Sequence, residues 1–460
     1  MPTSSSKLKH LAVLQGVFMY RKKGTIFGTI IVDEKGGTLM GNFDKVIGYD
    51  AIKGELEMVL DMIKNKERYE RLGAKIPRGI MLCGRPGVGK TLMAQSFIRA
   101  SGLKSYTLRR NQARGNFTST ISKVFEEAKA NAPAILLLDD LDKFADTDKE
   151  HPNAEEYVAV QAAMDSIRDE QVIVFATINE LRFLPTSLRR AGRFDVKLKV
   201  ENPTLEDASK IIKYYLRDKQ IDEGLNYDDL SKMIDYRSCA QLESTINNAA
   251  IFAGYEGKDK IEMEHIVKTV MKEQMGVHSG SEQIDERERR ERAYHEAGHL
   301  VVAEVLKPGI VGMAAINSQK EANIGGFVRK TGNMGWHYDV MTALGGKVAT
   351  ELRIGRCASG CKRDLINAQF ILANGIEGNG ICGVNMVAGE AIDVSDRFKD
   401  QAQSVVAAEM QNYINRVREL LVNNGEFLDK VAEVLMQKEV LLSSEIGRIK
   451  EGCQIKAMGM

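Results

Sequence analysis

The sequence predicts a multidomain protein in which an α/β domain with a parallel sheet and a small helical unit precede a mostly α-helical domain. The length of 460 residues corresponds to about three domains at roughly 100–200 residues each. Apolar strands alternate with helical stretches between Gly41 and Glu201, a pattern typical of a parallel sheet covered on both faces. From residue 203 to 275 the pattern is helical only.

Composition and charge exclude several classes of protein. The apolar fraction is 43% and the charged fraction 28%, which excludes a disordered chain, a collagen-like fibre and a coiled-coil rod. Sixty-four Lys and Arg against 63 Asp and Glu leave a net charge of +1. The near-zero net charge creates no overall electrostatic attraction for nucleic acid, and we expect no nucleic-acid partner. Six irregularly spaced cysteines predict reduced thiols in a reducing compartment.

No integral membrane segment is expected. The longest uncharged apolar run near the start is Leu11–Tyr20, whereas a helix needs about 20 apolar residues to cross a bilayer. The first residues do not form a basic-then-apolar signal peptide. We therefore expect a soluble, cytoplasmic protein.

The first half of the chain begins with a predicted hairpin. Two apolar runs within residues 7–33 flank Arg21-Lys22-Lys23-Gly24, in an N-terminal region that spans 1–40. Segment 41–202 forms the α/β domain. Its apolar strands are Gly79–Cys83, Ser105–Leu108, Ala134–Leu138 and Gln171–Ala176.

The second half is expected to be helical. Segment 203–275 forms the small helical unit, and 276–285, which contains Ser-Gly-Ser, is a linker. Segment 286–460 forms the last domain. It ends in two amphipathic helices, about 396–423 and 427–442, divided by Asn423-Asn424-Gly425.

A phosphate-binding loop follows the first strand of the α/β domain. Gly84-Arg85-Pro86-Gly87-Val88-Gly89-Lys90-Thr91 matches G-x-x-x-x-G-K-[ST] between a strand and a helix that begins at Leu92. Glycines let backbone N–H groups surround phosphate oxygens, and the helix N-terminus adds its positive end. We expect this segment, Leu92 included, to bind ATP, with Lys90 on the β and γ phosphates and Thr91 on Mg²⁺.

Polar groups at the ends of the next strands complete a predicted ATPase site. Asp139 fits the carboxylate on the Mg²⁺ side, and Asp140 fits the base that polarises water. Asn179 follows a neighbouring strand and is expected to orient that water. The loop Arg189–Asp195 carries arginines with no obvious partner in the same chain. An arginine finger supplied to a neighbouring subunit stabilises γ-phosphate charge, although solvated surface arginines are the commoner case.

The order GRPGVGKT, ILLLDDLDKF, ATIN and RRAGRFD resembles an AAA+ ATPase module. The resemblance implies that 41–202 is the nucleotide-binding domain and 203–275 the helical lid. It also implies a ring, usually a hexamer, with nucleotide at the subunit interfaces. By motif match, Arg190 and Arg193 are the trans-acting fingers, Asn179 is the sensor, and Gly48 belongs to the adenine pocket.

The third segment carries a metal-binding motif, H-E-x-x-H, at His295-Glu296-Ala297-Gly298-His299. Positions i and i+4 share a helix face, so both imidazoles can reach one Zn²⁺, while Glu296 can take a proton from water. The alternative is a pair of surface histidines. A catalytic zinc needs a third ligand, and spacing alone leaves several candidates: Asp285, Glu304, Glu351, Asp364 and Cys361.

AYHEAGH downstream of an AAA+ module resembles the FtsH family of ATP-dependent zinc metalloproteases. The runs Leu344–Leu352 and Ser359–Leu365 match that family, and the resemblance covers about residues 41 to 450. It implies an ATP-dependent zinc metalloendopeptidase that is a homo-oligomer acting on proteins or peptides. It also implies that Asp364 is the third ligand and Cys361 a structural thiol. Asn323–Val328 falls where the family has a strand beside the zinc, and such an edge could hold substrate by β-augmentation.

The sequence departs from the family pattern in three places. The family usually has two N-terminal membrane spans, and no such span is visible here. The usual Asp-Glu pair is Asp139-Asp140, whose second carboxylate is shorter by roughly 1.5 Å. Since a 1 Å misplacement can cost about 10²-fold in rate, slow ATP hydrolysis is expected unless a strand shift compensates. The pore loop, 111–117, contains one aromatic residue, Phe117, which is either the pore residue or part of the core.

Two further functions remain open. One is a remodelling ATPase or chaperone with weak proteolysis. The other is a zinc peptidase whose ATPase ring is mainly structural, which Asp140 and the altered pore loop favour. A non-catalytic scaffold conflicts with the complete HExxH and GKT sets.

Overall fold

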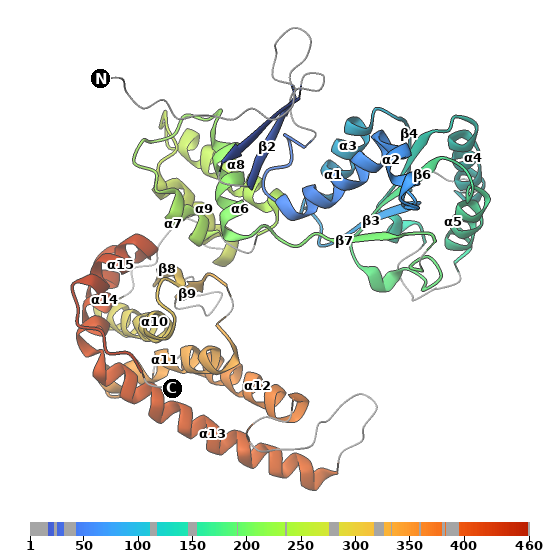
Figure 1. Cartoon of the computed structure of the whole chain (residues 1–460). Helices are drawn as coiled ribbons and strands as arrows, with labels where there is room; N and C mark the ends of the chain where they lie inside the picture. Colours follow the sequence, from blue (N-terminus) through green and yellow to red (C-terminus); the bar gives the residue numbers. More distant parts are fainter. Residues whose placement is uncertain are drawn as a thin grey trace, which may run out of the picture. The chain divides into compact units, whose positions relative to one another are not determined.

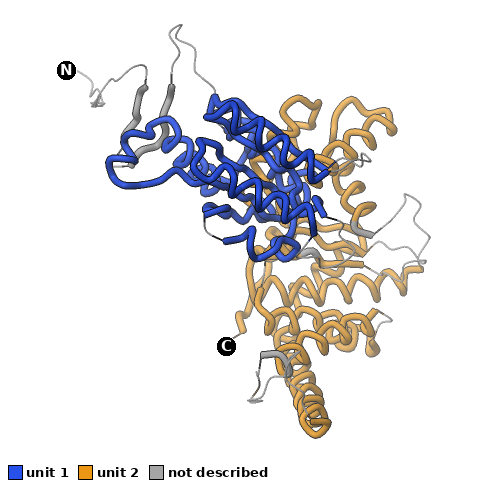
Figure 2. Tube along the Cα trace, turned by 90° about the vertical axis from the view of Figure 1, so that its right-hand side faces the viewer, with its two compact units in different colours: residues 1–203, 238–240 blue, residues 204–237, 241–460 orange. Residues whose placement is uncertain are grey.

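The computed structural model describes most of the chain in two compact units. Described are residues 17–22, 25–31, 43–110, 117–145, 154–190, 192–234, 237–275, 285–316, 326–332, 334–357, 360–379, 382 and 395–458. One unit comprises 1–203 with 238–240, and the other 204–237 with 241–460 (Figure 2). None of the described helices combines the length and apolarity that a membrane crossing requires.

A five-stranded parallel sheet forms the centre of the first unit. Its strands are β3 (Gly79–Cys83), β4 (Lys104–Arg109), β5 (Ala134–Asp139), β6 (Val172–Ile178) and β7 (Val196–Lys199), in the order β4-β5-β6-β3-β7. The four strands predicted from the sequence are present. The edge strand β7 was missed because its four residues, VKLK, alternate and are only partly buried.

Helices cover both faces of this sheet (Figure 1). On one face α3 (Lys90–Ser101) packs its Phe97 ring against Phe175, with centroids 5.2 Å apart. On the other face α4 (Phe117–Ala130) and α5 (Glu155–Ser166) share a core with alternate residues of β5 and β6. The remaining elements of this unit are α1 (Asp50–Lys64), α2 (Lys66–Arg71), η1 (Leu141–Lys143) and η2 (Leu181–Phe183).

The strand order determines where the ATPase residues meet. Strands β5, β6 and β3 are neighbours and parallel, so their carboxyl ends lie at one edge. Ligands of open α/β sheets bind at that edge. At the N-terminus, β1 (Val17–Lys22) and β2 (Thr25–Ile31) pair antiparallel, which confirms the hairpin over these residues.

The second unit is mostly helical. Segment 203–275, predicted to be helical, contains α6 (Leu205–Leu216), α7 (Tyr227–Met233), α8 (Cys239–Tyr255, apart from its first two residues) and α9 (Met263–Met275). The later helices are α10 (Glu286–Leu306), α11 (Trp336–Ile354), α12 (Cys361–Asn379), α13 (Asp396–Asn423), α14 (Gly425–Lys438) and α15 (Ser443–Glu451). A three-stranded antiparallel sheet of β10 (Val440–Leu442), β8 (Val311–Ala315) and β9 (Phe327–Lys330) has β8 in the middle.

The prediction of a helix over 427–442 was wrong at its C-terminal end. Helix α14 stops at Lys438, and Glu439 has a left-handed backbone with φ of 62°. The next residues form β10, which pairs with β8 far away in the sequence. Local periodicity cannot report such a pairing, because the partner strand, and not the segment itself, determines the conformation.

Helix α7 of the lid segment is anchored to α15. The buried carboxylate of Asp229 accepts hydrogen bonds from the backbone N–H of Ser444, at 2.8 Å, and from its hydroxyl, at 2.6 Å. The ammonium of Lys232 donates to the Ser443 hydroxyl at 3.2 Å. Asp229 therefore satisfies backbone and side-chain donors in the first turn of a helix more than two hundred residues later.

Candidate active sites

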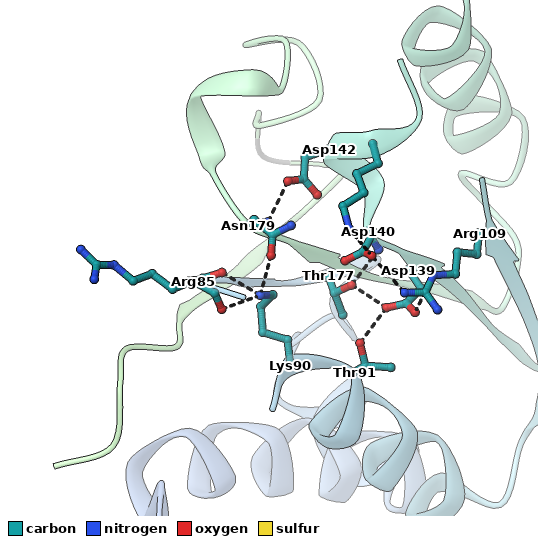
Figure 3. Close-up of polar contacts among 11 residues, drawn as sticks. Arg85, Lys90, Thr91, Arg109, Asp139, Asp140, Asp142, Thr177 and Asn179 are labelled. Atoms are coloured by element: carbon teal, nitrogen blue, oxygen red, sulfur yellow. Dashed lines mark hydrogen bonds and ion pairs between the residues drawn. The ribbon is translucent and has the colours of Figure 1, made fainter. Parts of the chain in front are cut away.

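The phosphate-binding loop lies between β3 and α3, as predicted (Figure 3). The ammonium of Lys90 donates to the carbonyls of Gly84 and Arg85, at 2.7 and 3.0 Å, and to Oδ1 of Asn179 at 2.9 Å. Burial lowers the pKa of Lys90 below its usual value, opposed by the charges of Asp140 and Asp142. The loop carbonyls and the Asn179 amide thus hold the cation where phosphate oxygens are expected.

Two loop glycines require left-handed backbone. The φ angles are 80° at Gly87 and 95° at Gly89, a region that side chains disfavour. Of the other expected nucleotide-binding residues, Val88 is buried, whereas Arg85, Pro86 and Leu92 are exposed.

The residue expected in the adenine pocket, Gly48, also has a positive φ, 72°. The hydroxyl of the following Tyr49 donates to the carbonyl of Glu201 at 3.1 Å and lies 3.4 Å from Sγ of Cys239. Cys239 Sγ in turn lies 3.7 Å from the carbonyl of Val88. The turn at Gly48 is thereby joined to the phosphate-binding loop.

Asp139 ends β5, and Asp140 follows it, beside Thr91 and Thr177 (Figure 3). Oδ1 of Asp139 accepts from the hydroxyls of Thr91, at 2.9 Å, and Thr177, at 2.7 Å. A carboxylate next to a hydroxyl fits the oxygen ligands that Mg²⁺ prefers. Asn179 is held by Asp142, whose Oδ2 accepts the Asn179 backbone N–H at 3.0 Å.

Asp140 makes two ion pairs. Its Oδ2 lies 3.1 Å from Nη2 of Arg109 and 2.8 Å from Nζ of Lys143. Burial alone raises the pKa of this carboxyl, but hydrogen bonds from Lys143 and Arg109 outweigh burial and hold the pKa below its usual value. The sequence did not predict that Arg109 and Lys143 pair with Asp140, because motif spacing does not indicate which side chains surround the end of β5.

The two candidate arginine fingers differ. Arg190 is exposed, whereas Arg193 pairs with Asp165 of α5, with Nη2 to Oδ2 at 2.7 Å and Nε to Oδ1 at 3.2 Å. The expectation that these arginines lack a partner in the same chain is therefore wrong for Arg193. The same pair holds the pKa of Asp165 below its usual value.

Phe117 begins α4 and packs edge-on against Phe144, with ring centroids 5.1 Å apart. This contact fits the interpretation of Phe117 as part of the core. The rest of the expected pore loop, 111–116, lies outside the described residues.

The second site lies between α10, α11 and α12. The Nε2 atoms of His295 and His299 are 3.2 Å apart, and Oδ2 of Asp364 lies 3.0 Å from the first and 3.4 Å from the second. Nδ1 of His299 donates to the carbonyl of Thr342 at 2.6 Å, which leaves Nε2 free for a metal. Oδ2 of Asp364 is buried and makes no hydrogen bond of good geometry among the described residues. Three convergent ligand atoms, one of them buried without a hydrogen bond, fit a zinc ion.

Glu296 lies on α10 between the two histidines and is almost fully buried. Burial raises the pKa of its carboxyl, against the opposing charges of His295 and His299. A Cβ added to Gly326, which precedes the edge strand β9, would lie 2.6 Å from Oε1 of Glu296. The edge strand therefore begins beside this carboxylate. The preceding part of the expected strand, 323–325, lies outside the described residues.

Of the other candidate ligands, the three carboxylates are engaged elsewhere. Asp285 caps α10 through the N–H of Glu288, and Glu304 accepts the N–H groups of Gly309 and Val311. Glu351 pairs with Lys347 and Arg418. Cys361 Sγ lies 4.0 Å from Nδ1 of His295, the nitrogen on the far side of the ring from Nε2.

Two glycines of α11 were not assigned a role from the sequence. A Cβ added at Gly345 would lie 2.5 Å from the carbonyl oxygen of Gly298. A Cβ added at Gly346 would lie 2.6 Å from both His295 Cε1 and His299 Nε2. Helices α10 and α11 thus touch through their backbones, and the space at Gly346 is taken by the imidazoles. The paired glycines in the sequence were the available signal.

Comparisons with known proteins agree with this geometry. The model of the ATPase family associated with various cellular activities (AAA) matches residues 80–202. The chain is 29% identical over 441 residues to the ATP-dependent zinc metalloprotease FtsH of Leptotrichia buccalis, covering 89% of this chain and 57% of that protein. It is 28% identical to FtsH of Caldicellulosiruptor bescii, covering 88% and 71%. It is 28% identical to the human ATP-dependent zinc metalloprotease YME1L1, covering 90% and 56%. The chain thus spans little more than half the length of two of these relatives.

Proposed function

We propose that the chain, which is similar to FtsH proteases over most of its length, is an ATP-dependent zinc metalloendopeptidase acting on proteins or peptides. One observation carries the proposal. A single chain holds a phosphate-binding loop beside an acidic strand end, and also the converging atoms of His295, His299 and Asp364. In this proposal the nucleotide-binding domain comprises residues 41–202, and its helical lid comprises 203–275. A linker, 276–285, connects the lid to the protease domain, 286–460, which hydrolyses the peptide bond.

At the ATPase site each residue has a proposed role. Gly48 and the segment from Gly84 to Leu92 bind ATP, and Thr91 and Asp139 hold Mg²⁺. Asp140 accepts the proton of the attacking water, which Asn179 orients.

Arg190 and Arg193 act on the nucleotide of a neighbouring subunit in a homo-oligomeric ring, which we propose to be a hexamer. For Arg193 this role requires release from Asp165. The proposed location is the cytoplasm, because six sparse and irregularly spaced cysteines are typical of a reducing compartment.

At the second site His295, His299 and Asp364 hold zinc, which supplies a Lewis acid and lowers the pKa of water to about 7. Glu296 accepts a proton from the attacking water and returns it to the leaving amine. Its burial favours this exchange, because a carboxyl shielded from solvent holds a proton more readily. The edge strand β9, which begins beside Glu296, supports substrate backbone in an extended form.

The test is casein degradation by the purified chain with zinc, with and without ATP, compared with Glu296→Gln. We expect degradation that requires both ATP and Glu296, with a loss of about 10²-fold or more in the variant. Intact ATP turnover without any cleavage would instead indicate a remodelling ATPase.

A second candidate is a zinc peptidase with a mainly structural ATPase ring. The side chain of Asp140 favours this candidate, because it is one methylene shorter than glutamate and pairs with two cations. Cleavage that requires Glu296 but not ATP would support this candidate.

A further inference from the structure

The Asp140 carboxylate is fixed through both its backbone and its side chain (Figure 3). Asp140 has a left-handed backbone, with φ of 55° and ψ of 51°. Its N–H donates at 2.9 Å to Oγ1 of Thr177, which itself donates to Asp139. The fully buried Thr177 hydroxyl therefore ties the Asp139 carboxylate and the Asp140 backbone to the end of β6.

The side chain is held through one oxygen only. Arg109 Nη2 and Lys143 Nζ both donate to Oδ2, at 3.1 and 2.8 Å. Oδ1 accepts no hydrogen bond from any residue in the described parts of the chain. A carboxylate anchored in this way has one free oxygen whose direction is set by the anchors.

The guanidinium reaches this position because of strand register. Arg109 is the last residue of β4 and lies opposite Asp139 in the parallel pair β4–β5. Its Nε is 3.7 Å from Oδ2 of Asp139, so one side chain spans both carboxylates. Lys143 comes from the other direction, on the short helix η1 that follows Asp140.

These pairs contribute little to folding. The side chains of Arg109 and Lys143 are 57% and 56% exposed. Exposed pairs are worth about 0–1 kcal/mol, so removing one does not unfold a domain of this size. Their effect is on the direction of the carboxylate, where small displacements have large consequences for rate.

We propose that Arg109, assisted by Lys143, is a positioning residue for ATP hydrolysis that holds Oδ2 of Asp140 and presents Oδ1 to the attacking water. This inference rests on the proposed ATPase activity. It assigns to two cations the task of directing a carboxylate that is one methylene shorter than the glutamate of the family pattern.

The test compares steady-state ATP hydrolysis by the full chain and by Arg109→Met. We expect kcat to fall about tenfold while the KM for ATP changes less than twofold, because Arg109 acts on the base and not on the bound nucleotide. Arg109→Lys should recover part of the rate. Lys104→Met removes a cation from the opposite end of the same strand and should change neither constant.

A second arm isolates the coupling to Asp140. In Asp140→Glu the carboxylate extends by roughly 1.5 Å beyond the Arg109 contact. Adding Arg109→Met to this variant should therefore lower kcat by about twofold or less. Binding of a fluorescent ATP analogue and the thermal unfolding midpoint should not change in Arg109→Met. A kcat that is unchanged or raised, or an equal loss in both backgrounds, would overturn the inference. A lack of ATP hydrolysis by the unmodified chain would contradict the proposed ATPase itself.

Discussion

The α11 backbone at Gly346 lies against both imidazoles of the candidate zinc site. A methyl group there would come within 2.6 Å of His295 Cε1 and His299 Nε2. Real side chains do not approach so closely, and the rings are too well packed to move without losing their orientation toward one point. The position of this glycine is therefore part of the metal geometry.

Gly346→Ala is expected to weaken zinc binding about 10–100-fold, the range seen when groups that orient metal ligands are altered. The affinity can be measured by competition with a chromogenic chelator. Gly447→Ala is the matched control, since a methyl group at that helical position meets nothing within 4 Å. Equal affinities in the two variants would contradict this explanation.

At the residue scale, motif spacing was sufficient for some residues only. His295, Glu296 and His299 follow from HExxH because an i, i+4 pair must share a helix face. Asp364 required the family resemblance, since several acids were equally compatible with the spacing. Arg109, Lys143 and Gly346 were missed, because their contacts depend on strand register and helix crossing rather than on nearby sequence.

At the element scale, helix α7 depends on a contact with α15. Asp229→Ala removes the buried acceptor of the Ser444 N–H and hydroxyl and leaves these partly buried donors unsatisfied. The free energy of unfolding should fall by about 1–3 kcal/mol, measured by urea denaturation of the full chain. Asp228→Ala is the control, because Asp228 is 70% exposed and pairs only with Lys232 among the described residues. A similar loss in both variants would show that the α7–α15 bond is unimportant.

Elements with strong local signals were the predictable ones. The helices of 203–275 and the buried strands β3, β5 and β6 form where the sequence predicts them, because amphipathic or continuous apolar patterns determine them. Strands β7 and β10 were missed for a different reason. Each is short, and each forms because a distant strand, β3 or β8, provides its hydrogen-bonding partner.

At the scale of the whole molecule, the two ligand sites belong to different compact units. The phosphate-binding loop lies in the first unit, and the zinc ligands on α10 and α12 lie in the second. A ligand stabilises the unit that binds it by RT ln(1 + [L]/Kd), about 2.7 kcal/mol at a hundredfold excess over Kd.

Calorimetry should therefore show two separable effects. Chelation of zinc should lower the unfolding temperature of the second unit only, and Mg·ATP should raise that of the first only. Lys90→Ala should abolish the nucleotide effect and leave the zinc effect intact. A loss of zinc stabilisation in Lys90→Ala would contradict the assignment of the sites to separate units.

The pairing of β10 with β8 has a consequence for protein synthesis. Strand β8 supports the edge strand β9 beside Glu296, yet its other neighbour, β10, is translated only after α11 to α14. Chains emerge at about 5–20 residues per second, so an interval of seconds separates the HExxH helix from the completed sheet. During this interval the nascent chain carries the candidate metal ligands while its three-stranded sheet still lacks β10.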